Sequence, residues 1–265
     1  MLDPHELELL LQARHPDPFA VLGQHVDADG DLWVRTLLPG ATEVLLHDTR
    51  TGRRVARLLP REGAGDFFEA LLPRRRRPFD YRLRVRWGDG EPVTLGDPYR
   101  YGPLLGDQDL HYLGEGSHRR PFEVLGAHPL TLGEGVYAID GVRFAVWAPN
   151  AMRVSVVGSF NGWDGRRHPM RVRGASGIWE LFIPGVRPGD AYQYEIRTRD
   201  STVLPLKCDP YARGAQMRPH TASLVTAALA PPKPLPPGRA AANARTAPVS
   251  IYEVHLGSWR RHPDG

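Results

Sequence analysis

Hydrophobic and polar side chains alternate with a period of two in several short segments of the chain. In segment 81–87 a tyrosine, a leucine, a valine and a tryptophan alternate with three arginines, and segments 179–183 and 192–197 follow the same rule. Such alternation places the hydrophobic side chains on one face of a half-buried β-strand. Gly-Asp-Gly, Asn-Gly and Pro-Gly sequences between the segments indicate tight turns. The pattern predicts an all-β fold built from antiparallel sandwiches of immunoglobulin-like size.

One segment departs from this pattern and predicts a helix at the start of the chain. Asp3 suits the N-cap, Pro4 suits the first helical position, and Glu6 completes a capping box. The side chains that would form the buried face of this helix are Leu7, Leu10 and Leu11. Helix signals are scarce in the rest of the chain, so we expect one helix packed on an otherwise β-structured module.

The pattern of strand signals occurs twice in the chain. The motif Pro-Phe-x-Val-Leu-Gly-x-His at residues 18–25 returns at residues 121–128. Further signals follow both copies in the same order, namely 32–39 with 142–149, 43–46 with 153–156, 68–73 with 179–184, 81–85 with 192–196, and 97–99 with 209–211. Each copy has about the length of a small domain and exceeds the usual solenoid repeat. We therefore predict two tandem β-sandwich modules, at residues 1–112 and 113–228.

The remaining residues predict a linker and the start of another domain. Residues 229–248 are rich in proline, and the run Pro-Pro-Lys-Pro-Leu-Pro-Pro-Gly at 231–238 favours an extended connector. Residues 249–265 begin with a hydrophobic stretch typical of one strand, with no later segment to pair with it. We expect this last part to be the truncated beginning of a third domain.

Composition narrows the possible partners. Of the 265 residues, 41% are hydrophobic and 24% are charged, as in globular proteins, and no apolar run approaches the roughly 20 residues of a membrane span. The 34 basic and 30 acidic residues are interspersed, so no nucleic-acid or membrane partner is expected. The start of the chain lacks an export signal, and the single cysteine, Cys208, fits a reducing compartment, so we expect a cytoplasmic location.

No segment carries a recognised catalytic or cofactor motif. The chain has no phosphate-binding glycine-rich loop and no Gly-x-Ser-x-Gly elbow, and its carboxylates sit in no context that separates an acid from a base. Several histidines are scattered without the close spacing of zinc ligands and are expected on the surface or in loops, namely His47, His111, His118, His168 and His220. We predict no catalytic residue, no metal and no cofactor.

The most informative short segment is Gly-Ser-Phe-Asn-Gly-Trp-Asp at residues 158–164. Pyranose rings have apolar faces and polar rims, so a sugar site needs an exposed aromatic ring and an amide or carboxylate, which Trp163 and Asn161 supply. The alternative, that Trp163 folds back over the sandwich edge, is left open by composition. The matching residues 48–52 of the first module contain no aromatic side chain, so sugar stacking is assigned to the second module only.

Four other tryptophans are expected to have structural roles. They lie within alternating strands, where most such residues belong to the core or its flank, and they are Trp33, Trp87, Trp147 and Trp179.

Several of these motifs together resemble bacterial 1,4-alpha-glucan (glycogen) branching enzymes. They are the doubled Pro-Phe-x-Val-Leu-Gly-x-His motif, Phe-Ala-Val-Trp-Ala-Pro-Asn-Ala at 144–151, Val-Gly-Ser-Phe-Asn-Gly-Trp-Asp at 157–164 and Ser-Ile-Tyr-Glu-Val-His-Leu-Gly-Ser-Trp at 250–259. The third motif alone indicates a glycogen-binding sandwich of the alpha-amylase superfamily, and the doubled module narrows the resemblance to the longer branching enzymes. The last motif is similar to the first strand of that superfamily's (β/α)8 catalytic barrel.

The resemblance implies a parent glycosyltransferase that moves alpha-1,4 chains to form alpha-1,6 branches by a retaining mechanism. Its catalytic carboxylates do not occur in this chain, so we expect no activity from these residues alone. The implied partners are alpha-glucans (glycogen and maltooligosaccharides) and the parent's own catalytic domain. The implied glucan contacts are Trp163 and Asn161, assisted by Gln193 or Lys207. The residues that match the parent's barrel strand are Tyr252 and His255.

Two other families and one departure qualify this resemblance. Debranching and trehalose-forming relatives also place one such sandwich before a barrel, but they have no obvious need of the first module. A stand-alone glycogen-binding module has no reason to carry the motif at 250–259. Related sandwiches place a second aromatic residue after the Tyr-x-Tyr strand, where this chain has Asp-Ser-Thr-Val at 200–203, so weak glucan affinity is expected.

Overall fold

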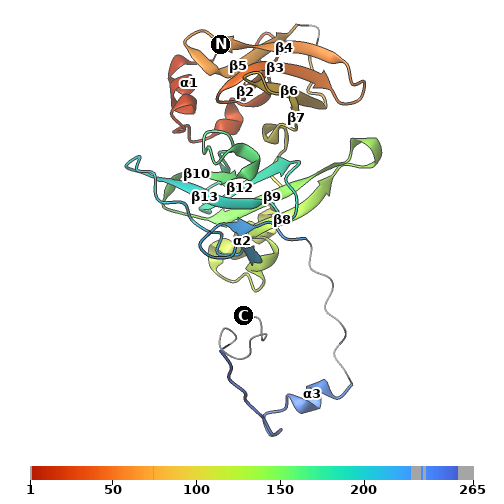
Figure 1. Cartoon of the computed structure of the whole chain (residues 1–265), viewed down its shortest axis with the longest axis vertical. Helices are drawn as coiled ribbons and strands as arrows, with labels where there is room; N and C mark the ends of the chain where they lie inside the picture. The colour runs from red at the N-terminus through yellow and green to blue at the C-terminus, as the bar shows by residue number, and fades with distance from the viewer. Residues whose placement is uncertain (1, 74, 228–233, 235–236, 256–265) are drawn as a thin grey trace, which may run out of the picture. The chain divides into compact units, whose positions relative to one another are not determined.

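The computed structural model describes residues 2–73, 75–227, 234 and 237–255. The chain forms two compact units, Met1–Ala228 and Leu229–Gly265. The first unit contains two β-structured modules, and the second contains the short helix α3 (Arg239–Ala242) in its described part (Figure 1). None of the described helices combines the length and the apolar character needed to cross a membrane.

The first module is a sandwich whose two layers share one strand. Its elements are α1 (Pro4–Leu11), η1 (Pro18–Ala20), β1 (Gly23–Val26), β2 (Leu32–Leu37), β3 (Ala41–Asp48), β4 (Arg54–Arg61), β5 (Ala64–Leu72), β6 (Tyr81–Trp87), β7 (Val93–Leu95) and η2 (Pro98–Arg100). The strands join in the order β1-β2-β5-β4-β3-β6-β7. Within β4, Leu58 faces Val44 of β3, whereas Leu59 faces Glu69 of β5. A strand that changes partners in this way turns the corner between two layers.

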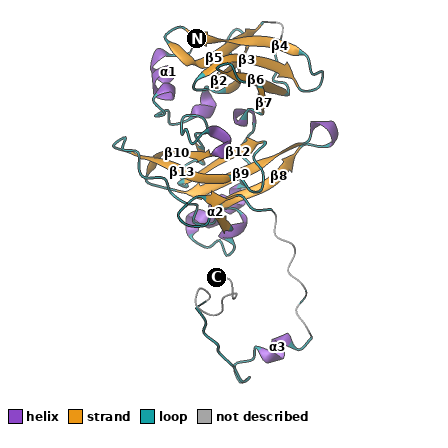
Figure 2. Cartoon of the chain, in the orientation of Figure 1, coloured by secondary structure: helices purple, strands orange, loops and turns teal. Residues whose placement is uncertain are grey.

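The second module is a sandwich of two separate four-stranded sheets, in the orders β10-β13-β15-β14 and β11-β12-β9-β8 (Figure 2). Its strands are β8 (Gly126–Leu132), β9 (Ile139–Trp147), β10 (Ala151–Gly158), β11 (Arg171–Val172), β12 (Ile178–Pro184), β13 (Ala191–Thr198), β14 (Gly214–Ala215) and β15 (Ser223–Leu224), with 3-10 turns η3 (Pro121–Glu123), η4 (Gly135–Tyr137) and η5 (Ser159–Asn161). Phe144, Val156, Trp179 and Tyr192 belong to the core between the sheets. The predicted pair of tandem all-β sandwiches is confirmed.

The helix content is larger than the sequence suggested. The predicted helix at the start is confirmed as α1, with Asp3 Oδ1 accepting from the backbone N–H of His5 at 3.0 Å. A second helix, α2 (Asp107–Glu115), was not expected, because Gly106 at its N-cap supplies no capping side chain. Its leucines pack against Leu125 and other buried residues of the second module. The predicted boundary between residues 112 and 113 falls within this helix.

The two modules contact each other directly and through the segment that connects them. Phe19 packs against the cores of both modules, and the guanidinium of Arg171 lies 3.3 Å from the centre of its ring. Tyr99 donates its hydroxyl to the carbonyl of Pro169 at 3.3 Å. Glu180 of β12 accepts the backbone N–H of Leu104 at 2.7 Å and that of Leu105 at 3.0 Å. The connector is therefore fixed on the second module.

The predicted barrel strand, at residues 249–259, lies partly beyond the described residues. Residues 249–255 have no assigned strand, and residues 256–265 lie outside the described part of the chain. The strand at 249–259 remains a prediction.

Candidate functional site

The turn that carries Trp163 follows β10 and the 3-10 turn η5. Gly162 takes φ 64° and Trp163 takes φ 61°, a left-handed backbone that side chains other than glycine rarely adopt. The backbone N–H of Trp163 donates to the carbonyl of Gly158 at 3.1 Å, which helps to hold this conformation. The turn leaves 39% of Trp163 exposed to solvent. An indole presented in this way is available to a flat apolar surface.

Asn161 lies inside the turn and uses both ends of its amide there. Its Oδ1 accepts the backbone N–H of Gly158 at 2.9 Å, and its Nδ2 donates to the carbonyl of Val156 at 2.9 Å and to Nδ1 of His168 at 2.8 Å. Only 1% of Asn161 is exposed. These contacts give Asn161 a role in shaping the turn that presents Trp163.

His168 lies in the loop beneath the turn, as the prediction of a surface or loop histidine allows, and its ring contacts Asn161. Burial, together with the nearby Arg167, lowers the pKa of His168 to about 3. The imidazole is therefore neutral at physiological pH, which suits the hydrogen bond that Nδ1 accepts from Asn161. No periodic pattern predicts the contact of His168 with Asn161, because His168 lies in the loop between η5 and β11.

The same loop is fixed to the first module by two arginines. Arg166 donates to Asp164 at 2.7 Å and pairs with Asp66 of the first module at 3.2 Å. Burial raises the pKa of Asp164, but the hydrogen bonds from Arg166 outweigh it, so the net pKa is lowered. The guanidinium of Arg167 lies 4.8 Å from the ring centre of Trp87. The position of the Trp163 turn thus depends on both modules.

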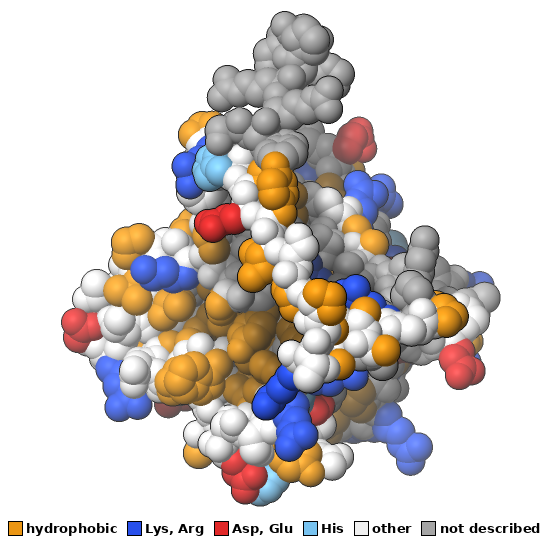
Figure 3. Space-filling model, turned by 90° about the horizontal axis from the view of Figure 1, so that it is seen from below, with side chains coloured by type: hydrophobic (Ala, Val, Ile, Leu, Met, Phe, Trp, Pro, Cys, Tyr) orange, Lys and Arg blue, Asp and Glu red, His pale blue; other side chains and the backbone are white. Residues whose placement is uncertain are grey.

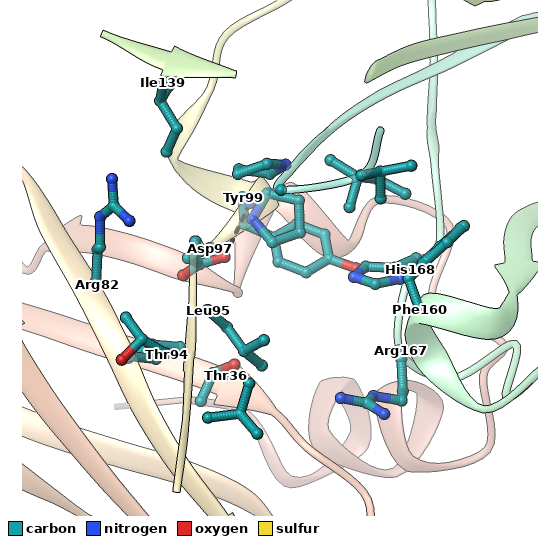
Figure 4. Close-up of a pocket in the computed structure, with 18 of the residues that line it drawn as sticks. Thr36, Arg82, Thr94, Leu95, Asp97, Tyr99, Ile139, Phe160, Arg167 and His168 are labelled. Atoms are coloured by element: carbon teal, nitrogen blue, oxygen red, sulfur yellow. Dashed lines mark hydrogen bonds between the residues drawn. The ribbon is translucent and has the colours of Figure 1, made fainter. Parts of the chain in front are cut away.

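Below the turn the two modules enclose a cavity of about 520 Å³ (Figure 4). Residues that line it from the two modules include Thr36, Tyr99, Ile139, Phe160, Arg167 and His168. Figure 4 shows Arg167 and His168 directed toward the first module's side of this space. Phe160, three residues before Trp163, therefore faces the junction while the indole is exposed.

The other predicted glucan contacts lie on β13 and its neighbour. Gln193 is 7% exposed and faces Val157 of β10, next to the start of the turn. Its Nε2 contacts Cys208 Sγ at 3.8 Å and Thr221 Oγ1 at 3.5 Å. Lys207 is exposed, and its backbone N–H donates to the carbonyl of Tyr194 at 2.9 Å. The structure thus brings Gln193 and Lys207 onto neighbouring segments.

The predicted barrel residues belong to the other compact unit. Tyr252 is 70% exposed, and His255 is also exposed. Both lie in Leu229–Gly265, whereas the Trp163 turn lies in Met1–Ala228.

The exposure of Trp147 contradicts the prediction that it belongs to the core or its flank. It is 62% exposed at the end of β9, whereas Trp179 on β12 is 4% exposed, as expected for the core. Trp147 lines a groove of about 620 Å³ with Leu113, Ile178 and other side chains. Hydrophobic side chains gather in a hollow on the face shown in Figure 3. Trp147 is the last residue of its strand, where the alternation that predicts burial ends.

The geometry suits non-covalent recognition. Within the described residues, no group of three or more His, Cys, Asp or Glu side chains is placed to hold a metal ion. The exposed indole on a rigid turn, supported by a neutral histidine and an ionised aspartate, offers a binding platform.

Two family models match the chain, one in each module. The model for the alpha-1,4-glucan branching enzyme GlgB, N-terminal domain, matches residues 3–99. The model for carbohydrate-binding module 48 (isoamylase N-terminal domain) matches residues 124–212, which include the Trp163 turn.

Several solved structures are similar to parts of the chain. A putative alpha amylase from Salmonella typhimurium is 27% identical over 39% of this chain and 15% of its own, with a TM-score of 0.28. A pullulanase from Anoxybacillus sp. LM18-11 is 17% identical over 77% of this chain and 27% of its own, with a TM-score of 0.31. The same pullulanase complexed with maltotetraose is 18% identical over 88% of this chain and 28% of its own, with a TM-score of 0.32.

The chain spans less than a third of the length of each of these proteins. The identification rests on the two family models, which follow each other in the order of the two modules. By these models, the first module belongs to the N-terminal domains of alpha-1,4-glucan branching enzymes and the second to carbohydrate-binding module 48.

Proposed function

We propose that this region binds alpha-glucan at the Trp163 turn and holds it for a branching reaction carried out by a catalytic domain of the same protein. The observation that carries the proposal is the partly exposed indole of Trp163 on a turn whose shape is fixed by Asn161. The turn lies within the segment matched by the carbohydrate-binding module. In the parent, the reaction would transfer alpha-1,4 chains to form alpha-1,6 branches.

A single platform of this kind supports weak binding. Stacking one pyranose face on an indole removes on the order of 100 Å² of apolar surface from water, which contributes about 2–3 kcal/mol. With some hydrogen bonds added and the cost of ordering the sugar subtracted, roughly millimolar affinity per site is expected. The segment 200–203 after β13 supplies no second aromatic ring, so this affinity is not raised by a paired stack. Many weak contacts along one polymer suffice to retain it.

Gln193 and Lys207 support the proposal in different ways. Lys207 is exposed and can donate to sugar hydroxyls, whereas Gln193 is mostly buried and is better placed to support the strand beside the turn. Asn161 likewise acts through the turn, since its amide is already occupied. We therefore assign direct contact to Trp163 and Lys207 and positioning to Asn161 and Gln193.

Glycogen co-sedimentation and a titration with maltoheptaose test the proposal. Trp163→Ala should lower binding about thirtyfold or more, the loss that corresponds to a stacking contact of about 2–3 kcal/mol. Trp147→Ala is the matched control, because it removes an exposed indole from the same module outside the turn. Normal pelleting of the Trp163→Ala protein with glycogen would refute the assignment.

We also propose that this chain has no branching activity by itself. An amylose–iodine assay should show no spectral shift with the purified chain. A clear shift that follows the protein through purification would contradict this proposal.

A further inference from the structure

A second pocket lies on the first module, at the place that corresponds to the Trp163 turn. The turn after β3, at residues 48–52, occupies the position in the duplicated fold that the turn after β10 occupies in the second module. A pocket of about 490 Å³ opens beside it on the outer side of β3, β6 and β7. Its lining residues are His47, Asp48, Thr49, Gly52, Arg82, Arg84 and Thr94.

The pocket carries uncompensated positive charge. Arg82 and Arg84 are exposed on the outer face of β6, and neither side chain has an ion pair or hydrogen bond with a described residue. The carboxylate that lines the pocket, Asp48, is already paired with Arg75 at 2.9 Å. Burial raises the pKa of Asp48, but hydrogen bonds from Thr51 and Arg75 outweigh it, so the net pKa is lowered and the group is ionised.

Two further polar atoms of the pocket lack partners. Among the described residues, His47 Nε2 and Thr49 Oγ1 are buried and have no hydrogen bond. His47 Nδ1 lies 3.3 Å from the carbonyl of Gly52, so Nε2 is the ring nitrogen that remains available. Buried polar atoms without partners are uncommon in folded proteins. Rotation of either side chain toward the pocket would bring its unpartnered atom within reach of a bound ligand or of water ordered by it.

We propose that this pocket binds the phosphate monoester of a hexose. Guanidinium groups bind phosphate oxygens through paired hydrogen bonds, and Arg82 and Arg84 present two such groups on one strand face. Thr49 and His47 add polar contacts at the wall. The volume of about 490 Å³ exceeds what a phosphate group needs and leaves room for a sugar ring near Thr94.

The second module does not share this chemistry. Gln193 and Glu195 stand at the positions that correspond to Arg82 and Arg84, and Glu195 is paired with Arg153. The duplicated fold therefore keeps a neutral aromatic platform in one module and a basic pocket in the other. The phosphate ester has two sources, a free hexose phosphate and a phosphorylated glucosyl residue of a glucan, which share the chemistry that the pocket recognises.

Calorimetric titration of the full chain at low salt tests the proposal. Glucose 6-phosphate should bind at least about tenfold more tightly than glucose or inorganic phosphate, because it alone offers both the charge and the ring. A phosphorylated maltooligosaccharide that displaces glucose 6-phosphate would identify the polymer as a source, and failure to displace it would assign the site to the free ester. Equal binding of glucose would overturn the proposal.

Matched double variants separate a site from diffuse charge. Arg82→Gln combined with Arg84→Gln should weaken glucose 6-phosphate binding at least about tenfold. Arg57→Gln combined with Arg86→Gln removes the same charge from the same sheet, but these arginines flank Glu43 at 3.9 and 4.0 Å outside the pocket, and less than about a twofold loss is expected. Equal losses in the two proteins would overturn the proposal.

The test is independent of glucan binding at the other module. The Trp163→Ala protein should keep its affinity for glucose 6-phosphate, so failure of either proposal leaves the other measurable. Thr49→Val, which removes one unpartnered hydroxyl with little change of shape, should weaken the sugar phosphate about twofold to fivefold. No change with Thr49→Val would contradict the placement of the ligand against this wall.

Discussion

The two modules share a buried tyrosine–aspartate pair but differ in how strongly it is hydrogen bonded. In the first module, Tyr81 donates its hydroxyl to Asp97. In the second, both Tyr192 and Tyr194 donate to Asp209, at 2.7 and 3.1 Å. Burial raises the pKa of each of these aspartates despite the hydrogen bonds. Both modules thus keep a buried tyrosine–aspartate hydrogen bond, and the second module has one additional tyrosine hydroxyl that donates to the same aspartate.

A second difference concerns one glutamate of the repeat. Glu180 is 2% exposed and accepts from the connector and from Arg173 at 3.0 Å. The side chain of Glu69, at the matching position, is 19% exposed and pairs with Arg35 at 3.3 Å and Arg61 at 3.4 Å. In the second module the glutamate at this position binds the connector, whereas in the first module it forms partly solvated ion pairs with two arginines.

The largest expected effect separates these glutamates. Glu180→Ala should lower the free energy of unfolding by about 3 kcal/mol, because it leaves the backbone N–H groups of Leu104 and Leu105 without acceptors and removes the ion-pair partner of Arg173. Glu69→Ala should cost about 1 kcal/mol, since the Glu69 carboxylate is itself partly exposed and its ion pairs with Arg35 and Arg61 are partly screened by solvent. Urea denaturation at neutral pH measures both. Equal costs would show that the connector contacts contribute little.

The next effect depends on pH and belongs to the second module. In the second module His168 lies opposite Val156. The corresponding pair in the first module is Ala56 opposite Leu46. Burial lowers the pKa of His168 from 6.5 to about 3, so the unfolded chain takes up this proton first. Its contribution is therefore complete above pH about 6.5 and is lost as the pH falls below that value, at about 1 kcal/mol per pH unit.

Comparison of His168→Gln with the parent chain isolates this contribution. The variant keeps an acceptor for Asn161 but cannot titrate, so its stability should fall less steeply between pH 6.5 and 4.5 than that of the parent. Denaturation midpoints at several pH values provide the measurement. Parallel pH profiles for the two proteins would rule out His168 as the source.

The tyrosine–aspartate pairs give a smaller difference. Tyr81→Phe should cost about 2 kcal/mol, because Asp97 then keeps only the backbone N–H of Tyr99 as a donor to its buried carboxylate. Tyr192→Phe should cost about 1 kcal/mol, since Tyr194 still donates to Asp209. Thermal unfolding of both variants tests the order. A larger loss for Tyr192→Phe would refute the idea of an additional donor.

The smallest effect is expected at Trp147. Its counterpart in the repeat, Leu37, is 4% exposed, whereas Trp147 is 62% exposed. Trp147→Ala should therefore cost less than about 1 kcal/mol, while Leu37→Ala should cost about 2–3 kcal/mol. Urea denaturation distinguishes the two. A large loss for Trp147→Ala would mean that the indole supports the fold through the groove that it lines.

The repeat itself contained a helix signal that periodicity missed. Leu10 lies eight residues before Pro18, and Leu113 lies eight residues before Pro121. Extending the repeat toward the amino terminus would therefore have predicted α2 from α1. The capping rules failed because α2 has glycine at its N-cap and Gly114 within its last turn.

Other features depended on contacts that a single sequence does not reveal. The strands and the turn that carries Trp163 follow from local patterns, because alternation and Asn-Gly turns act over a few residues, whereas composition left the exposure of Trp163 open. The burial of Asn161 does not, since it depends on His168, which comes from a different part of the loop. Likewise, the unpaired charges of Arg82 and Arg84 appear only when their neighbours across the sheet are known.

Phe19 belongs to both hydrophobic cores, and its ring lies between Tyr99, with ring centres 4.9 Å apart, and Arg171. A side chain shared in this way means that neither module can unfold at this place without exposing part of the other. A proteolytic cut in the connector would therefore leave the two halves associated. We therefore expect local unfolding of one module at this place to destabilise the other.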